Sequence, residues 1–325
     1  MDFITSIVPE QPAALEALLD SLIDYAGLFP PARLPLDSAL EEYVTRLAEP
    51  DLSRYLGCFV IPVGLLPQAS AWLRQRSGPG PARPRFSVLA GPEDQCGVVA
   101  AAVHEFATSL PGAGVEMLEL KATARPANGY AGISRLLDGM EAAFGCDGPP
   151  RGVFVEIDWR HDPSAAMALL EKRQGVGAKL RSGGLTPDLV PPPAGVARFL
   201  QAAARFRLPL KFTAGLHVPV PNDDPAVGAR MHGFLNLMAA AMAAYRGGTS
   251  AEILVQTLER LSYADFGFDE EAFRAGALRF SVNEIRDLRR HVRGFGSCSF
   301  LEPLEHLAEH GLLASTPHKR ESLAQ

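Results

Sequence analysis

The chain has 325 residues, of which 47% are apolar and 21% charged, and its formal net charge at pH 7 is −6. This composition excludes a chain that is disordered throughout, and the acidic balance argues against a nucleic-acid-binding protein, because phosphate binding needs a basic surface. No apolar run approaches the ~20 residues of a membrane-spanning helix. The start lacks the pattern of a secretory signal, and the four cysteines form no C-x-x-C pair. We therefore expect a cytoplasmic protein without disulfides that binds neither nucleic acid nor membrane.

Short apolar runs that are typical of buried parallel strands recur about every 30 residues, and a helical pattern follows each of them. The runs are residues 25–29, 56–62, 85–90, 115–121, 152–158, 176–181 and 209–214; the helical segments are 36–47, 67–76, 93–110, 129–144, 163–173, 194–206 and 229–245. This alternation indicates linked βαβ units, and an eighth unit would complete an α/β fold of the (β/α)8 TIM-barrel type. An open doubly wound sheet is the alternative, although no Gly-x-Gly-x-x-Gly follows the first strand.

The eighth strand is the least regular part of this pattern. We place it near residues 295–300, with 277–282 as the competing segment. Further helical patterns precede it and predict a helical insertion after the seventh strand, while residues 9–24 predict an extra helix before the barrel. We expect one barrel domain over residues 1–315 and a disordered tail over residues 316–325.

Polar and charged residues occupy one face of four successive predicted strands. The pairs are Glu119 and Lys121, Glu156 and Asp158, Lys179 and Arg181, and Lys211 and Thr213. Alternate side chains of a strand point to opposite faces. In a barrel, we expect the apolar face to contact the helices and the charged face to point into the mouth, where the active sites of barrel enzymes lie.

The cations of this face suit a small anionic ligand. Lys179 and Arg181 share one strand and Lys211 lies on the next, so we expect a cluster that binds a carboxylate or a phosphate, with Arg181 able to make two parallel hydrogen bonds. Crowding of cations lowers a lysine pKa and frees an amine to attack a carbonyl group.

The acids of this face have several candidate roles. Glu119, Glu156 and Asp158 could act as general acids and bases, hold a divalent cation such as Mg or Mn, or serve as counter-ions of the lysines. The sequence does not decide between these roles, so no metal is assigned.

One stretch has a family resemblance. The segment Gly177-Ala-Lys-Leu-Arg-Ser-Gly-Gly184, followed after a helix by Leu208-Pro-Leu-Lys-Phe-Thr-Ala-Gly-Leu216, resembles the sixth and seventh strands of the deoxyribose-phosphate aldolase group of class I aldolases, which are (β/α)8 barrels. The resemblance implies that Lys179 is the Schiff-base lysine, that Lys211 is its electrostatic partner, and that Glu119 or Asp158 moves protons. It covers about 40 residues, and Arg181 stands where that group has a small residue.

Loop residues complete the candidate site. His217 follows the seventh strand and is a candidate acid–base group or metal ligand, with a local hydrogen bond as the alternative role. Gly183 and Gly184 follow the sixth strand and could present backbone N–H groups to a phosphate, with a tight turn as the alternative. Lys121 and Thr213 complete the expected substrate-binding set.

Residues outside this set carry weaker expectations. Asp24 and Tyr25 adjoin the first strand, and either could reach the mouth. Cys298 has no histidine beside it in the sequence, so we do not expect it to be a nucleophile. His232 and Asn236 are expected to cap a helix or to lie in the core.

Together these patterns predict an enzyme of the lyase or aldolase type that acts on a small anionic carbonyl metabolite. One alternative is a Mg- or Mn-dependent lyase or isomerase that uses Glu119, Glu156 and Asp158. Another is a non-catalytic barrel that binds an anion or a protein. The apolar helix near residues 231–245 packs either on the barrel or on a second copy in a homo-oligomer, and the sequence leaves both options open.

Overall fold

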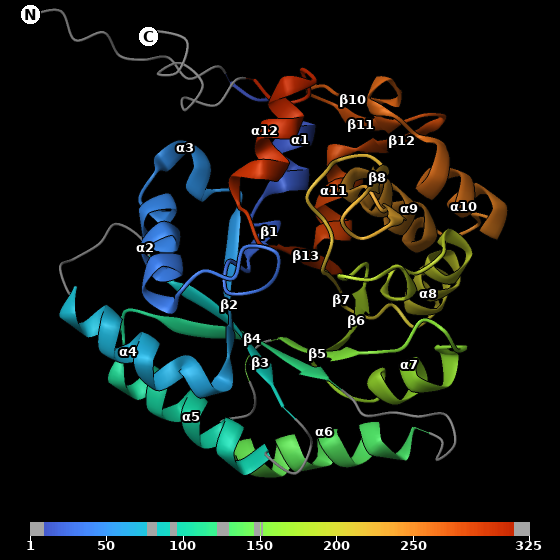
Figure 1. The fold of residues 1–325 in the computed structure, drawn as a ribbon. Helices are drawn as coiled ribbons and strands as arrows, with labels where there is room; N and C mark the ends of the chain where they lie inside the picture. The colour runs from blue at the N-terminus through green and yellow to red at the C-terminus, as the bar shows by residue number, and fades with distance from the viewer. Residues whose placement is uncertain are drawn as a thin grey trace, which may run out of the picture.

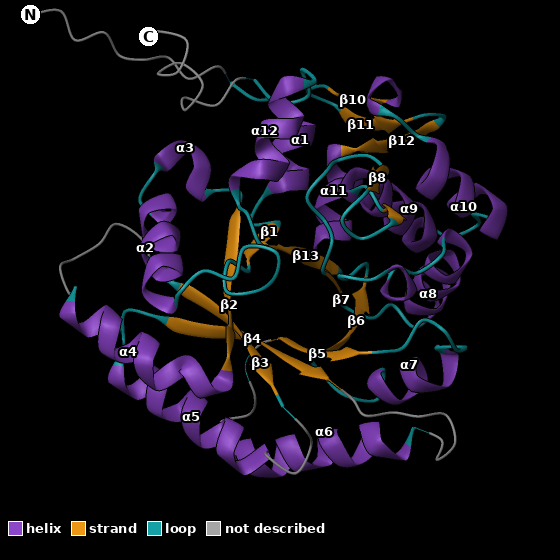
Figure 2. Cartoon of the chain, viewed as in Figure 1, coloured by secondary structure: helices purple, strands orange, loops and turns teal. Residues whose placement is uncertain are grey.

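A closed barrel of parallel strands forms the centre of the molecule, and helices surround it (Figures 1 and 2). The computed structural model describes residues 10–76, 83–91, 96–121, 130–145, 150 and 152–314. Within them the barrel strands follow one another in the spatial order β1-β13-β7-β6-β5-β4-β3-β2. Their bounds are β1 (Ile23–Tyr25), β2 (Leu56–Pro62), β3 (Arg85–Ala90), β4 (Gly114–Lys121), β5 (Gly152–Glu156), β6 (Val176–Arg181), β7 (Leu210–Thr213) and β13 (Val292–Ser297). The predicted (β/α)8 barrel is confirmed.

Helices alternate with these strands along the chain. They are α2 (Leu36–Leu47), α3 (Pro50–Ser53), α4 (Leu66–Gln75), α5 (Cys96–Ser109), α6 (Ala131–Phe144), α7 (Ser164–Leu170), α8 (Pro193–Arg205) and α12 (Leu301–Glu309), with 3-10 turns η1 (Val63–Leu65) and η5 (Pro187–Leu189). Helix α8 illustrates how they form: Pro193 occupies its first position, where a missing N–H costs nothing, and Val196, Phe199, Leu200 and Ala203 make one buried face.

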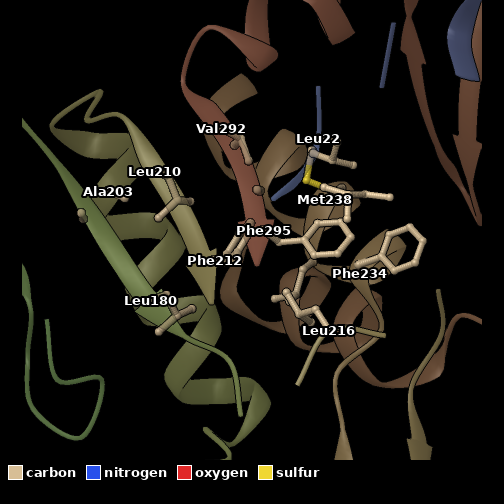
Figure 3. Packing of buried hydrophobic residues seen from close by; sticks show 14 of the residues in the cluster. Leu22, Leu180, Ala203, Leu210, Phe212, Leu216, Phe234, Met238, Val292 and Phe295 are labelled. Atoms are coloured by element: carbon tan, nitrogen blue, oxygen red, sulfur yellow. The ribbon is translucent and has the colours of Figure 1, made fainter. Parts of the chain in front are cut away.

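The apolar faces of the strands contact the helices, as Figure 3 shows for one side of the barrel. Leu180, Phe212 and Phe295 point outward from β6, β7 and β13 and are at most 1% exposed. The ring of Phe295 stacks on Phe234 at a centroid distance of 5.0 Å. Burial of each such side chain contributes about 1.5–3 kcal/mol. Because this face is fixed outward, the alternate residues of the same strands must point into the barrel.

The first strand starts and ends earlier than predicted. Residues 25–29 were expected to form it, but β1 is Ile23–Tyr25, and the chain then turns, with the Phe29 N–H donating to the Ala26 carbonyl at 2.9 Å. Tyr25 points outward and stacks on Tyr43 of α2 at 6.5 Å. The preceding residue, Asp24, therefore faces the interior and is 2% exposed.

Two other strand ends differ from expectation. The eighth strand lies in the predicted region but is Val292–Ser297, because Phe300 already begins the turn into α12. The competing segment contains β12 (Leu278–Ser281), an antiparallel strand outside the barrel. Strand β5 ends at Glu156, two residues before the predicted end, so Asp158 lies in the following loop.

A long insertion separates β7 from β13, as predicted, and it contains strands as well as helices. Its elements are the hairpin β8 (Asn222–Asp224) and β9 (Ala229–Met231), α9 (Phe234–Arg246), α10 (Ala251–Arg260), η6 (Tyr263–Asp265), the antiparallel sheet β10 (Phe266–Phe268), β11 (Ala272–Ala275) and β12, and α11 (Val282–Arg289). The predicted N-terminal helix is α1 (Ala13–Leu19), which contacts the insertion where the Ala14 N–H donates to the Asp269 carbonyl at 3.2 Å.

The apolar helix α9 packs within this chain. All ten residues from Phe234 to Ala243 are buried in the single copy, which places this helix on its own barrel. His232 and Asn236 also have core roles: Asn236 donates to the Thr257 carbonyl of α10 at 2.8 Å. Across the part of the chain that the structure describes, no helix has the length and apolarity that a bilayer crossing requires. The expected tail at residues 316–325 lies outside the described residues.

Candidate active site

Inward-facing side chains of β1, β3, β4, β5, β6 and β7 converge in one charged cluster. Strand register brings them together: Glu156 lies beside Lys179, and Lys179 beside Lys211, on adjacent strands. Glu119 comes from β4 and Asp24 from β1. The interiors of (β/α)8 barrels are usually filled by branched apolar residues, so this charged layer is a departure from ordinary core packing.

Lys211 forms the floor of the cluster. Its side chain has no exposed surface, and its Nζ lies 2.5 Å from Asp24 Oδ2, 2.6 Å from Glu119 Oε1 and 3.3 Å from Ser87 Oγ. Burial alone would lower the pKa of this ammonium, but the two adjacent carboxylates outweigh it and raise the pKa above the ordinary lysine value. Lys211 is therefore a fixed positive charge.

Glu119 links the two lysines. Its Oε1 accepts from Lys211 and from the Ser87 hydroxyl at 2.6 Å, and its Oε2 lies 3.1 Å from Lys179 Nζ. Burial would raise the pKa of this carboxyl, but the two ammonium groups and the Ser87 hydroxyl hold it well below its usual range. Glu119 is thus ionised at neutral pH and acts as an anchor for both lysines, which makes it a poor proton donor.

Lys179 lies between two carboxylates. Its Nζ is 3.1 Å from Glu119 Oε2 and 3.0 Å from Glu156 Oε2. The second oxygen of Glu156, Oε1, is 3.4 Å from Arg181 Nε. Burial raises the pKa of Glu156, but Lys179 and Arg181 outweigh it and lower the pKa below its ordinary value. Glu156 is therefore a carboxylate held in direct contact with the Lys179 ammonium.

Asp24 completes the cluster from the side of β1. Its Oδ1 accepts the Cys58 N–H at 2.6 Å, which fixes the carboxylate against β2. Burial raises its pKa, and the Lys211 ammonium opposes that rise. When all groups are ionised, the carboxylates of Asp24, Glu119 and Glu156 balance the charges of Lys179, Lys211 and Arg181. Such balance is what allows charges to stay buried.

Exposure increases along the cluster toward the carboxyl ends of the strands. The exposed fractions of the side chains are 0% for Lys211, 5% for Lys179, 14% for Glu156 and 36% for Arg181. Lys121, next to Glu156 in the register, is exposed, and Thr213, next to Arg181, is half-buried. Arg181 and Lys121 are therefore the more exposed of these charged side chains, and Lys179 and Glu156 are more deeply buried.

Strand β13 contributes no side chain to the interior beside this cluster. A Cβ at Gly294 would lie 2.6 Å from the Leu22 carbonyl oxygen and 3.6 Å from Asp24 Oδ2. At Gly296 the nearest atom would be Thr213 Oγ1, at 3.6 Å. Glycine at 294 is therefore required by close packing, whereas glycine at 296 leaves space at the mouth.

Asp158 does not join the cluster, which corrects the sequence-based expectation. Because β5 ends at Glu156, Asp158 turns outward, with 38% of its side chain exposed and its Oδ1 3.2 Å from Arg160 Nη1. The three acids that were candidates for Mg or Mn thus do not meet, and Glu119 and Glu156 face ammonium groups instead. Among the described residues, no group of three or more His, Cys, Asp or Glu is placed to hold a metal ion.

The glycine pair after β6 has a packing role. A Cβ at Gly183 would lie 2.7 Å from Met231 Cε and 3.3 Å from the Ala214 carbonyl, and one at Gly184 would lie 2.5 Å from Leu189. The pair lets the loops after β6 and β7 approach each other. His217 lies in the second of these loops, where its Nδ1 is 3.0 Å from Glu302 Oε2.

Sequence reasoning gave Asp24 only a minor role and missed Ser87. The first strand was expected at residues 25–29, which left Asp24 just before it, whereas β1 begins at Ile23 and includes Asp24. Ser87 is the polar residue within the apolar run of β3, between Phe86 and Val88, and that isolated hydroxyl was the available signal. No protein-family model and no curated protein sequence matches the chain, so the site is interpreted from its own geometry.

Proposed function

We propose that the barrel mouth is an active site of the lyase or aldolase type, in which Lys179 forms an imine with the carbonyl group of a small anionic metabolite. The observation that carries this proposal is the position of Lys179. It is the more exposed of the two lysines in the buried cluster, and its Nζ contacts two carboxylates at 3.0 and 3.1 Å. A nucleophilic lysine needs a proton acceptor beside it, and Glu156 can take that role when a ligand engages Arg181, which also contacts it.

A purely structural role explains the cluster less well. Replacing a buried ion pair by packed apolar residues is often neutral or stabilising by about 1–4 kcal/mol, so stability alone does not favour lysines in a barrel core. A catalytic role does favour them, because a substrate carbonyl reaching Lys179 needs an amine, a proton acceptor and fixed charges in one place.

The chemistry follows from the contacts of Lys179 and Glu156. Glu156 accepts a proton from the Lys179 ammonium, and the free amine attacks the carbonyl carbon. Glu156 returns its proton to the carbonyl oxygen, which leaves as water, and a protonated imine remains. This cation can accept the electron pair of the bond between the α and β carbons, so that an enamine forms as that bond breaks and the β-hydroxyl group passes its proton to Glu156.

Arg181 couples ligand binding to this proton transfer. Its Nε lies 3.4 Å from Glu156 Oε1, and about a third of its side chain is exposed. An anionic ligand that engages Arg181 draws it away from Glu156, whose pKa then rises toward its usual value. Glu156 becomes a stronger proton acceptor at the moment the ligand is in place. Lys211 keeps Glu119 oriented toward Lys179 throughout.

Borohydride reduction tests this proposal directly. The protein is incubated with pyruvate or with glyceraldehyde 3-phosphate, reduced, digested and analysed by mass spectrometry. We expect a stable adduct on Lys179, which Lys179→Arg abolishes and which Lys172→Arg, at an exposed surface lysine, leaves unchanged. Adducts spread over the surface lysines of both variants would contradict the proposal.

The same variants separate an enzyme from a non-catalytic anion-binding barrel. If no adduct forms, but pyruvate raises the melting temperature of the wild type and not of Arg181→Gln, the binding role replaces the catalytic one. We place the protein in the cytoplasm as part of this proposal, because the described cysteines Cys58, Cys96 and Cys298 form no disulfide.

A further inference from the structure

Three side chains at the rim of the mouth form a second arrangement that the lysine cluster does not use. Cys298 follows β13, His217 follows β7, and Glu302 lies in the first turn of α12. The Cys298 Sγ is 3.7 Å from His217 Nε2, and His217 Nδ1 is 3.0 Å from Glu302 Oε2. The His217 imidazole thus contacts the Cys298 thiol through one ring nitrogen and the Glu302 carboxylate through the other. Catalytic triads have the same arrangement, in which a nucleophile, a base and an acid that orients the base follow one another.

Hydrogen bonds fix the orientation of this imidazole. Ser297 Oγ lies 3.2 Å from His217 Nδ1, and the same hydroxyl donates to the Ser299 carbonyl at 2.6 Å. The Glu302 N–H in turn lies 3.2 Å from Ser299 Oγ, which ties the first turn of α12 to the Cys298 loop. The three groups are therefore held by the ends of two barrel strands and by one helix.

The charges around His217 favour its protonated form. Burial lowers its pKa, but Cys298 and Glu302 outweigh burial and raise it to about 9. His217 in turn lowers the pKa of Glu302, and His306, on the same helix, contributes to that shift. Tyr25 of β1 interacts electrostatically with Cys298, and its phenol donates to Glu42 at 2.5 Å. At neutral pH an imidazolium therefore lies 3.7 Å from the Cys298 sulfur.

The two other described cysteines have different surroundings. Cys58 is buried, and desolvation together with Asp24 raises its pKa well above the ordinary value. Cys96 is buried against α6, with its Sγ 3.9 Å from the Leu136 carbonyl oxygen. Cys298 is as buried as Cys96, at 9% and 8% exposed, but it follows the carboxyl end of β13, whose interior position 296 is glycine.

We propose that Cys298, His217 and Glu302 form a second reactive centre, a thiolate–imidazolium pair that adds to the aldehyde carbon of a small anionic metabolite. The Cys298 sulfur forms a bond to the carbonyl carbon, the carbonyl π bond breaks, and the oxygen takes the proton of His217 Nε2. The product is a thiohemiacetal. Nothing leaves, and no oxidant or reductant is needed. Glu302 holds the imidazole and is a positioning residue.

The first test measures the rate of alkylation of Cys298 by iodoacetamide between pH 6 and pH 9, with each cysteine followed by mass spectrometry. All variants carry Cys146→Ser, because Cys146 lies outside the described residues, and Cys58 and Cys96 are internal references. An ordinary thiol loses about tenfold in rate for each pH unit below 8. We expect Cys298 to lose less than threefold between pH 8 and pH 6.5, and His217→Gln to restore the ordinary slope.

Two variants separate a reactive centre from a structural contact. Glu302→Gln keeps the size of the side chain, and we expect it to slow alkylation at pH 6.5 several-fold while the protein stays folded by circular dichroism. Glyoxylate should protect Cys298 from iodoacetamide in the Lys179→Arg background, where no imine forms, so this result is independent of the proposed function. A Cys298 rate at pH 6.5 that is the same in the wild type, His217→Gln and Glu302→Gln would overturn the proposal, as would absence of protection by glyoxylate.

Discussion

The Lys211→Met substitution tests whether the buried charges are coupled as the structure describes. Methionine fills a similar volume but leaves Asp24 Oδ2 and Glu119 Oε1 without the ammonium that lies 2.5 and 2.6 Å from them. Both carboxylates are about 2% exposed, so water cannot replace the lost partner without opening the barrel. Breaking a buried ion pair in this way costs about 3–5 kcal/mol of unfolding free energy.

Urea unfolding and thermal melting measure this loss. We expect a fall of about 4–7 °C in melting temperature for Lys211→Met. The variant Lys172→Met, at an exposed position, should change the unfolding free energy by less than about 0.5 kcal/mol. In the double variant Lys211→Met with Asp24→Asn, the total loss should fall short of the sum of the single losses by about 1–3 kcal/mol, because one unpaired carboxylate is removed.

The pKa of Lys211 also predicts how the stability difference between the wild type and Lys211→Met depends on pH. The pKa of Lys211 is raised on folding, so its contribution is complete below the unfolded pKa of about 10.4 and is lost only as pH rises through the higher folded value. The contribution of Lys211 to the wild type should therefore be constant between pH 6 and pH 9, and the wild type should be more stable than Lys211→Met throughout that range. A difference below 1 kcal/mol across that range would refute the coupling of these charges.

Three further predictions concern the groups at the mouth. Glu156→Gln should slow imine formation at Lys179 by at least about 100-fold, whereas Asp158→Asn should leave it unchanged; equal rates would remove Glu156 as the proton acceptor. Arg181→Gln should weaken pyruvate binding about 10-fold in calorimetry and change stability by less than 1 kcal/mol; unchanged affinity would argue against its role. Because folding raises the pKa of His217, its protonated form stabilises the fold, and this contribution is complete below about pH 6.5. About 2 kcal/mol of unfolding free energy should be lost between pH 6.5 and 9. His217→Gln should abolish that slope, and a slope that persists would assign it elsewhere.

The strand phase of the charged residues could be predicted from the sequence, because alternation is a local property. In β6, Ala178 and Leu180 alternate with Lys179 and Arg181, and the structure places the first pair outward and the second inward. Strand ends are less well determined, because they depend on turns and on neighbours. Asp158 followed the same alternation but lay beyond the end of β5.

The partners of the candidate residues could not be predicted in the same way. Cys298 and His217 are 81 residues apart in the chain, and they meet because β7 and β13, the strands that precede them, are neighbours in the barrel. The contact of Lys211 with Ser87, 124 residues away, depends on the same closure. Such contacts cross the barrel interior and follow from its register, which no local pattern specifies. The sequence therefore predicts which residues face inward, while the barrel decides which of them meet.

A crystal structure of the protein after treatment with pyruvate and borohydride would show whether Lys179 forms the imine. We expect continuous electron density from Lys179 Nζ to the former carbonyl carbon. The carboxylate of the adduct should lie at Arg181, and Lys211 should still be paired with Asp24 and Glu119. An unmodified Lys179 that remains within ion-pair distance of both glutamates, with the adduct on another lysine, would contradict it.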